Sequence, residues 1–168
     1  MKYLVSLFLI SILFLGCGYK PSSYYAKDAI VGNVFVSLTV DIDNTQSSVY
    51  VKDAMNEMIL NQFKARLTDD KEKADTFVTV ALSDVSHTAI SSNDDGYTQS
   101  YRTTVNISVS YNKKDESAKT LSVSDYYDYS VDSDTSLTDQ KKNIATKIAS
   151  TKALSNLFSK IAVNSMKE

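Results

Sequence analysis

The 168-residue chain has one cysteine, one histidine, one proline, four glycines and no tryptophan. A single cysteine cannot form a disulfide within the chain. Four glycines are too few to build a glycine-rich phosphate loop, and the scarcity of glycine and proline argues against a disordered or repetitive protein. With so little histidine and cysteine, only carboxylates remain as metal ligands. The composition therefore favours an ordinary globular domain without a metal or nucleotide cofactor.

The chain also lacks an excess of positive charge. It has 18 lysines and arginines against 20 acidic residues, a formal net charge of -2. Removal of Lys2 with a leader peptide would change this value to -3. No basic field is present to attract a polyanion, so we expect no nucleic-acid partner.

The N-terminus has the layout of a bacterial lipoprotein signal. Lys2 precedes an apolar run over residues 3–15, and Gly16-Cys17 closes that run. The run is shorter than the roughly 20 residues that cross a bilayer comfortably. We predict a signal peptide over residues 1–16 and lipidation of Cys17, whose acyl chains would tether the mature protein to a membrane. The alternative is an uncleaved anchor helix with an incidental cysteine.

The mature chain is predicted to be a tether followed by one domain. Gly18 and Pro21 discourage regular structure, so residues 17–32 are interpreted as a lipidated tether and residues 33–168 as a single domain. Apolar residues alternate or recur every three to four positions along that domain, in the order β-α-β-β-β-α. The predicted strands are 34–42, 78–90 with a register irregularity near Val85, 97–111 and 121–131. The first predicted helix is capped at Ser47 or Ser48 and ends near residues 68–70, and the second covers about 138–163.

The periodicity also predicts which helical side chains are buried. The first helix should bury Met55, Met58, Ile59, Phe63 and Leu67, and the second Ile144, Ile148, Leu154, Leu157, Phe158 and Ile161. The last three strands can form an antiparallel meander, and the first strand joins it through a crossover helix as a parallel neighbour. We therefore predict an α+β two-layer sandwich: a four-stranded mixed sheet with both helices on one face.

The uncovered face of that sheet is the most informative surface. On the strand at 97–111 it presents Ser, Thr and Asn side chains with one charge, Arg102. Such groups are buried at lower cost than ions, so this face suits a polar enclosure formed by another polypeptide. An ordinary Ser/Thr-rich strand exterior is the alternative. The candidate contact residues are Ser100, Thr104, Asn106 and Ser108.

Catalysis and metal binding have little support. His87 is the sole histidine and lies in a predicted strand, where a general base is uncommon. The acidic pairs do not have the spacing of a calcium loop. They are Asp94-Asp95, Asp125 with Asp128, and Asp132 with Asp134. We expect no enzyme, and no cofactor besides the lipid on Cys17.

The lipobox Phe14-Leu15-Gly16-Cys17, continuing as Gly18-Tyr19, and the order β-α-β-β-β-α resemble the lipopolysaccharide-assembly lipoprotein family, LptE. Further points of resemblance are Asp43-Asn44-Thr45 entering the first helix, Ala74-Asp75 before the second strand, and the long C-terminal helix. The resemblance implies a protein on the periplasmic face of the outer membrane, seated in the β-barrel that inserts lipopolysaccharide. There it would act as a plug and assembly factor and bind lipopolysaccharide.

By chemistry alone, the phosphate groups of a lipid would pair with cationic side chains. The candidates are Arg102, Lys113, Lys114 and Lys119. Two other functions remain open. One is a periplasmic lipoprotein that activates a peptidoglycan synthase, although such proteins usually have a longer tether. The other is a lipid-anchored hydrolase, for which the sequence offers no nucleophile and base pair.

Overall fold

The computed structural model describes residues 22–40, 45–94, 96–131 and 138–165, so the predicted leader and Cys17 lie outside the described residues. In chain order the elements are α2 (Ser22–Ala29), β1 (Asn33–Thr39), α3 (Thr45–Met58), the π-helix η2 (Ile59–Phe63), β2 (Arg66–Leu67), the 3-10 helix η3 (Lys71–Lys73), β3 (Thr76–Ser92), β4 (Thr98–Lys113), β5 (Lys119–Ser130) and α4 (Asp139–Ser165). None of the described helices has the length and apolarity needed to cross a bilayer.

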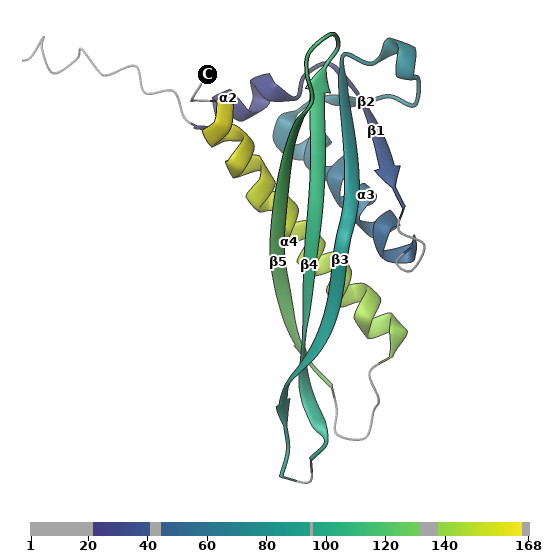
Figure 1. Ribbon diagram of the computed structural model, residues 1–168, viewed down its shortest axis with the longest axis vertical. Coiled ribbons are helices and arrows are strands. Elements are labelled where there is room, and N and C mark those ends of the chain that lie inside the picture. The colour runs from purple at the N-terminus through teal and green to yellow at the C-terminus, as the bar shows by residue number, and fades with distance from the viewer. Residues whose placement is uncertain (1–21, 41–44, 95, 132–137, 166–168) are drawn as a thin grey trace, which may run out of the picture.

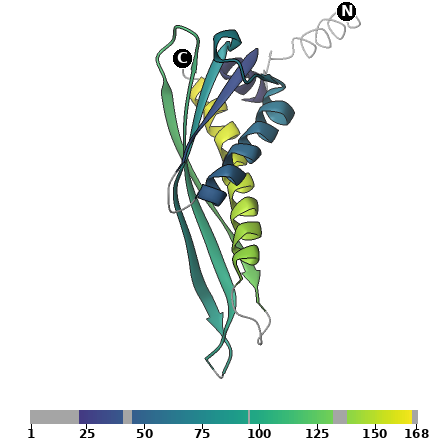
Figure 2. The ribbon, with the colours of Figure 1, turned by 90° about the vertical axis from the view of Figure 1, so that its right-hand side faces the viewer.

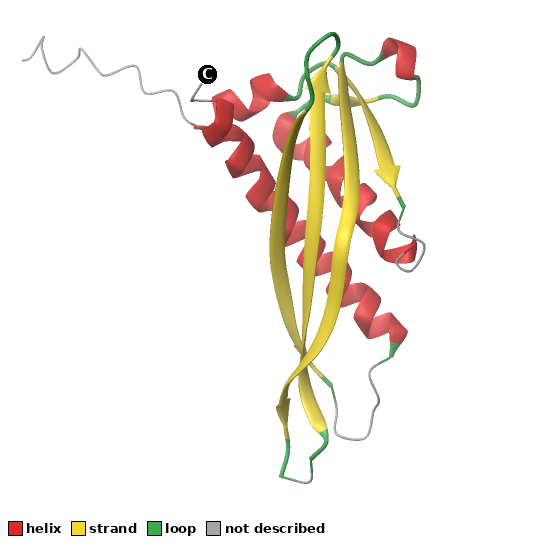
Figure 3. Ribbon diagram, in the orientation of Figure 1, coloured by secondary structure: helices red, strands yellow, loops and turns green. Residues whose placement is uncertain are grey.

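The strands form one curled, half-barrel-like mixed sheet in the order β2-β1-β3-β4-β5 (Figures 1 and 3). β1 runs parallel to β2 and β3, whereas β3-β4 and β4-β5 are antiparallel. The parallel placement of the first strand and the antiparallel meander are thus confirmed. The prediction of four strands was wrong, because the two residues of β2 are too few to show a periodicity.

The helices lie on one side of the sheet, as Figure 2 shows. α4 runs along the sheet, packing against β4 and β5 and against the other two α-helices. The core between the layers contains Val36, Met55, Ile107, Leu157 and Ile161 among others. Full burial of one such aliphatic side chain contributes about 1.5–3 kcal/mol. The opposite face of the sheet carries no helix among the described residues.

A register shift between Leu82 and Asp84 keeps the long strand β3 amphipathic. Before the shift, even-numbered residues such as Val80 face the helices, and after it odd-numbered residues such as Val85 do. A bulge adds one residue to a strand and so exchanges its two faces. The predicted irregularity near Val85 is therefore confirmed, and it lets β3 extend beyond the helices as a hairpin with β4 (Figure 1).

The first long helix differs from the prediction at both ends. It begins at Thr45, slightly before the predicted cap at Ser47 or Ser48, and it ends in the π-helical turn η2. Lys64 stops the helix with a left-handed backbone, φ 59°, and donates its N–H to the carbonyl oxygen of Ile59. Leu67 therefore falls in β2, where it is exposed instead of buried. The burial predicted for Met55, Met58, Ile59 and Phe63 is confirmed.

The predicted tether was wrong from residue 22 onward. Ser22–Ala29 forms α2, which packs against α4, and Ala26 and Ile30 are fully buried. Thr76 fixes the turn that follows, since its hydroxyl donates to the carbonyl oxygen of Val31 at 2.8 Å. The folded domain thus starts by residue 22, and not at residue 33.

The buried face of α4 is a stripe at four-residue intervals, Ala145, Ala149, Ala153, Leu157 and Ile161. Such a stripe follows one side of a helix. The predicted burial of Leu154, Leu157 and Ile161 is confirmed, and Ile148 and Phe158 are partly buried. The prediction for Ile144 was wrong. It is 53% exposed, because Ala145 takes the inward position in that turn.

Candidate functional site

The side of β1, β3, β4 and β5 that faces away from the helices is called the open face here. The register of the strands places one set of alternate residues there. It includes Phe35, Ser37, Phe77, Thr79, Ala81, Asp84, Ser86, Thr88, Ser100, Arg102, Thr104, Asn106, Ser108, Ser110, Thr120, Ser122, Ser124, Tyr126 and Asp128. Hydroxyl groups dominate this set on β4 and β5, whereas on β1 and β3 the cross-strand pair Phe35 and Phe77 adds an apolar patch.

The four predicted contact residues lie together on the open face. Ser100, Thr104, Asn106 and Ser108 occupy alternate positions of β4 and are each partly exposed. Asn106 donates through its side-chain amide to the carboxylate of Asp84 at 3.4 Å. The central strand therefore presents a row of neutral polar groups interrupted by one charge, Arg102, which is the pattern that the sequence predicted.

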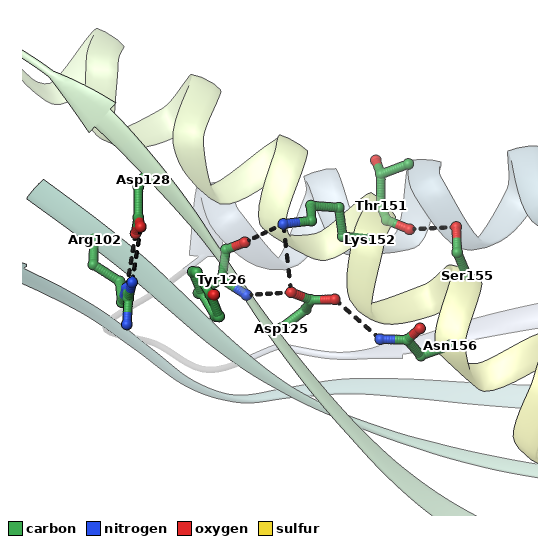
Figure 4. Close-up of polar contacts among 8 residues, drawn as sticks. All are labelled: Arg102, Asp125, Tyr126, Asp128, Thr151, Lys152, Ser155 and Asn156. Atoms are coloured by element: carbon green, nitrogen blue, oxygen red, sulfur yellow. Dashed lines mark hydrogen bonds and ion pairs between the residues drawn. The ribbon is translucent and has the colours of Figure 1, made fainter.

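The charges on the open face of β3, β4 and β5 have polar partners. Arg102 donates two hydrogen bonds to Asp128, at 2.7 Å from Nε and 2.8 Å from Nη2 (Figure 4). Its guanidinium also lies 3.9 Å from the ring centroid of Tyr126. The hydrogen bonds from Arg102 lower the pKa of Asp128, and the same bonds raise the pKa of Arg102. The pair is held ionised and neutral overall.

Tyr126, on the outermost strand β5, has both backbone groups occupied (Figure 4). Its N–H donates to Oδ1 of Asp125 at 2.7 Å, and its carbonyl oxygen accepts from Nζ of Lys152 on α4 at 2.7 Å. Lys152 Nζ is also 3.6 Å from Asp125 Oδ1, and Asn156 donates to the other carboxylate oxygen at 3.0 Å. These side chains cover the outward edge of β5 at this point.

A second contact repeats this cover further along β5. Lys160 donates to the carbonyl oxygen of Ser122 at 2.8 Å. Lys152, Asn156 and Lys160 are four residues apart, so they lie on one flank of α4. Lysines at an edge strand oppose pairing with another strand. We call this stretch of β5, with its three partners on α4, the sealed edge. The sequence did not show it, because the partners are 26 to 38 residues apart.

The four predicted basic contacts do not form one site. Arg102 faces the open face and is paired with Asp128, whereas Lys113, Lys114 and Lys119 lie where β4 turns into β5. Lys113 is eleven positions after Arg102 along β4, roughly 36 Å of extended chain. Lys113 and Lys119 line a cavity of about 250 Å³ together with Asp28 and Glu116. That cavity therefore has mixed charge.

His87 lies on the helix side of β3. Its Nδ1 is 2.7 Å from the hydroxyl oxygen of Thr103, which is fully buried and so out of reach of a substrate. Burial lowers the pKa of His87, and the positive charge of Lys142 lowers it further. The contact is typical of a histidine at the margin of a core.

One of the three acidic pairs, Asp125 with Asp128, lies wholly within the described residues, and both carboxylates have polar partners. Asp125 and Asp128 are three residues apart on β5, so their side chains point to opposite faces. In the parts of the chain that the structure describes, no three His, Cys, Asp or Glu residues gather as metal ligands. Asp94 is exposed, and Asp95, Asp132 and Asp134 lie outside the described residues.

Solved structures share this fold at low sequence identity. The rare lipoprotein B from Shewanella oneidensis is 14% identical, with a TM-score of 0.52 over 79% of this chain and 97% of that one. A protein from Xanthomonas campestris is 8% identical, with a TM-score of 0.50 over 82% of this chain and 88% of that one. These similarities show that the chain shares its α+β fold with both proteins.

The family assignment comes from the sequence match over residues 35–162, which fit the model of the LptE family, described as lipopolysaccharide-assembly. The match covers most of the chain, and the chain belongs to the LptE family. It is accordingly a lipopolysaccharide-assembly lipoprotein, as the resemblance implied. No protein of curated function matches it significantly in sequence.

Proposed function

We propose that this protein is an outer-membrane lipoprotein that plugs, and helps to assemble, the β-barrel that inserts lipopolysaccharide into the outer leaflet. The observation that carries the proposal is the open face: a sheet surface opposite the helices that is rich in hydroxyl and amide groups on β4 and β5. Family membership supports a role in lipopolysaccharide assembly. The open face supports the particular role of a plug.

The physical argument is the low cost of enclosing this surface. An ion that loses its water is destabilised far more than a hydroxyl group that exchanges one hydrogen bond for another. Arg102 and Asp128 already neutralise each other, and Asp84 accepts a hydrogen bond from Asn106. A polar barrel lumen with trapped water can therefore surround the face at low cost, because the one ion pair is neutral overall and the carboxylate of Asp84 keeps a hydrogen bond.

The sealed edge fits the same role. A barrel is built of strands, and a protein that enters it with a free edge would compete for their pairing. Lys152 and Lys160 occupy carbonyl groups along the edge of β5. The cover lets β5 lie beside barrel strands without joining their sheet.

Lipopolysaccharide contacts are proposed at the turn between β4 and β5. Lys113, Lys114 and Lys119 lie there, and ammonium groups pair with phosphate. Arg102 is the weaker candidate because its guanidinium is engaged by Asp128.

Anchoring through Cys17 is part of the proposal. Residues 18–21 separate the lipidated cysteine from α2 and can span at most about 3.6 Å each. So short a connection keeps the domain near the membrane, which suits a barrel in that membrane better than a peptidoglycan synthase across the periplasm. Mass spectrometry of the mature protein and of a Cys17→Ser variant tests the anchor.

The proposed function is tested by co-purification of the export barrel from detergent-solubilised outer membrane. Asn106→Lys and Ser108→Lys place charges on the open face and should reduce the recovered barrel at least tenfold. Thr151→Lys, on the exposed side of α4, is the matched control and should leave recovery unchanged. Equal recovery with all variants, or recovery of a peptidoglycan synthase instead, would contradict the proposal.

A further inference from the structure

The second half of β3 has an edge that no other part of the described chain pairs with. β1 pairs with β3 only as far as Ala81, whereas β3 continues to Ser92 with β4 on its other side. Figure 2 views the molecule from the β1 side, and there the lower part of β3 lies in the open with the helices to one side. We call residues 82–92 of β3 the free edge. At about 3.4 Å per residue it is roughly 37 Å long.

The hydrogen bonds at the two ends of β4 fix the direction of its backbone groups. At one end, Lys114 donates its N–H to the carbonyl oxygen of Asp75, just before β3, at 2.9 Å. At the other end, the N–H of Val131, just after β5, donates to the carbonyl oxygen of Gln99 at 2.9 Å. Backbone groups alternate in direction along a strand. Even-numbered residues of β4 therefore bond to β3, and odd-numbered residues bond to β5.

This alternation shows which backbone groups of the free edge point outward. Between the register shifts, the even-numbered residues of 84–89 lie opposite even-numbered residues of β4 and bond to them. Val85, His87 and Ala89 have the other direction, so their N–H and C=O groups point away from β4. The same rule turns Ser122 and Tyr126 of β5 outward, and their carbonyl groups do accept from lysines of α4. The free edge thus presents three donors and three acceptors.

The free edge carries none of the residues that commonly protect an edge strand. Over residues 82–92 the sequence has no lysine, arginine or proline, and it has one carboxylate, Asp84. Lysine and proline at an edge keep foreign strands away. The sealed edge of β5, in contrast, is covered by Lys152 and Lys160. One edge of this part of the sheet is therefore closed to strand pairing, and the other is open to it.

The free edge is complementary to itself. His87 is the central residue of the range 82–92, and its backbone groups point outward. A two-fold axis at His87 places an antiparallel second copy so that Val85 lies opposite Ala89 of the second copy, and His87 lies opposite the same residue. Every outward residue then meets an outward residue. The two strands also end together, so that neither overlaps β1 of the other copy.

We propose that two copies of this protein pair antiparallel through the free edge, in the register centred on His87, and so join their sheets into one. Backbone bonds between strand edges supply the affinity in this mode of association. The pairing uses the edge alone and leaves both open faces uncovered. The inference therefore does not depend on the barrel proposed for the open face.

The side chains of the central stretch agree with this register. Residues 85–89 contain no lysine, arginine or carboxylate. Ser86 lies opposite Thr88 of the second copy, and such hydroxyl pairs stabilise neighbouring strands. The His87 pair is uncharged at neutral pH, since burial and the charge of Lys142 lower the pKa of His87. A stable dimer buries about 1,200–2,000 Å². One strand edge is a narrow contact, so we expect a dimer that dissociates on dilution.

Cysteine crosslinking of the full-length chain in detergent tests the register. In a Cys17→Ser background, His87→Cys places the two introduced thiols opposite each other, with Cα atoms about 5.5 Å apart and within disulfide reach. Val85→Cys places them four positions apart, roughly 14 Å and out of reach. The covalent dimer from His87→Cys should be at least tenfold more abundant than that from Val85→Cys. A mixture of Val85→Cys and Ala89→Cys chains should restore the crosslink.

Sedimentation velocity of the uncrosslinked protein measures the strength of pairing. Ala89→Pro removes an outward donor and should raise the dissociation constant of the dimer at least tenfold. Ser124 lies opposite Asn106, so its N–H points outward on the sealed edge, and Ser124→Pro is the matched control that should leave the constant unchanged. Circular dichroism shows that both variants are folded.

Three results would overturn the proposal. The first is equal crosslinking of His87→Cys and Val85→Cys, which would show a different register. The second is a crosslink of similar yield from Ser124→Cys, which would place the contact on β5. The third is a protein that stays monomeric at every concentration and gives no crosslink from His87→Cys or from the mixed chains.

Discussion

Lys152 Nζ lies 2.7 Å from the carbonyl oxygen of Tyr126 and so joins the long C-terminal helix to the outermost strand of the sheet. The contact occupies a backbone acceptor that would otherwise pair with a foreign strand, while Asp125 occupies the N–H of the same residue. One residue of β5 thus has neither outward group available. The helix protects the sheet edge as well as covering the core.

Removal of the two lysines should expose the edge without unfolding the protein. Lys152→Ala with Lys160→Ala should cost less than about 1 kcal/mol of unfolding free energy, because contacts at the surface are screened by water. Self-association should increase with protein concentration. Urea unfolding and sedimentation velocity measure the two effects. Lys147→Ala, on an exposed part of α4, is the control. A double variant that self-associates no more than the wild type would show that the edge needs no cover.

The segment after the predicted lipidation site should prove to be part of the fold. Ile30→Ala removes a fully buried side chain and should reduce the unfolding free energy by about 2–5 kcal/mol. The neighbouring change Val31→Ala, at an exposed residue, should cost less than about 1 kcal/mol. Chemical denaturation of both variants gives the comparison. Equal effects of the two changes would show that residues 22–30 are a tether and not part of the folded domain.

The assignment of the buried face of α4 can be tested in the same way. Leu157→Ala, at a fully buried position, should cost about 2–5 kcal/mol, whereas Ile144→Ala should be nearly neutral. Both changes remove an aliphatic side chain from the same helix, so helix propensity contributes similarly. If Ile144→Ala were the more damaging change, α4 would be rotated relative to the arrangement described.

His87 should have a pKa below its ordinary value of about 6.5, because burial and the charge of Lys142 disfavour its protonated form. NMR titration of the imidazole resonances measures this pKa without overlap, since the chain has one histidine. Lys142→Ala should raise that pKa.

The folded state binds fewer protons at the His87 site than the unfolded state, because the pKa of His87 is lower in the folded protein. The stability from neutral His87 is therefore present above pH 6.5 and is lost as pH falls through the folded pKa. An unchanged or raised pKa in the wild-type protein would contradict the burial of the ring.

Strong periodic patterns in the sequence predicted most of the fold. The alternation in β4 and the interruption near Val85 in β3 carried enough information to place both faces of the sheet. Two short elements had no such pattern. An eight-residue helix is marginal by itself and forms here because Ala26 and Ile30 pack within the core. β2 consists of two residues that pair with β1.

Other features depend on contacts that no local pattern shows. The alanines of α4 face the core. The prediction placed large apolar side chains in the core, and for that reason it buried Ile144 instead of Ala145. The candidate site was predicted in part: the row from Ser100 to Ser108 lies on one face, as expected. The pairing of Arg102 with Asp128 and the cover of β5 by Lys152 depend on how distant segments align, which the sequence alone did not determine.

The central claim is that the open face is the surface enclosed by the export barrel, and site-specific photocrosslinking tests it most directly. Probes at Asn106 and Ser108 on the open face, and at Thr151 on the exposed side of α4, are compared in living cells. We predict strong crosslinks from the first two positions to the barrel that inserts lipopolysaccharide, and weak ones from Thr151. Crosslinks of equal strength from all three, or none to that barrel, would contradict the account.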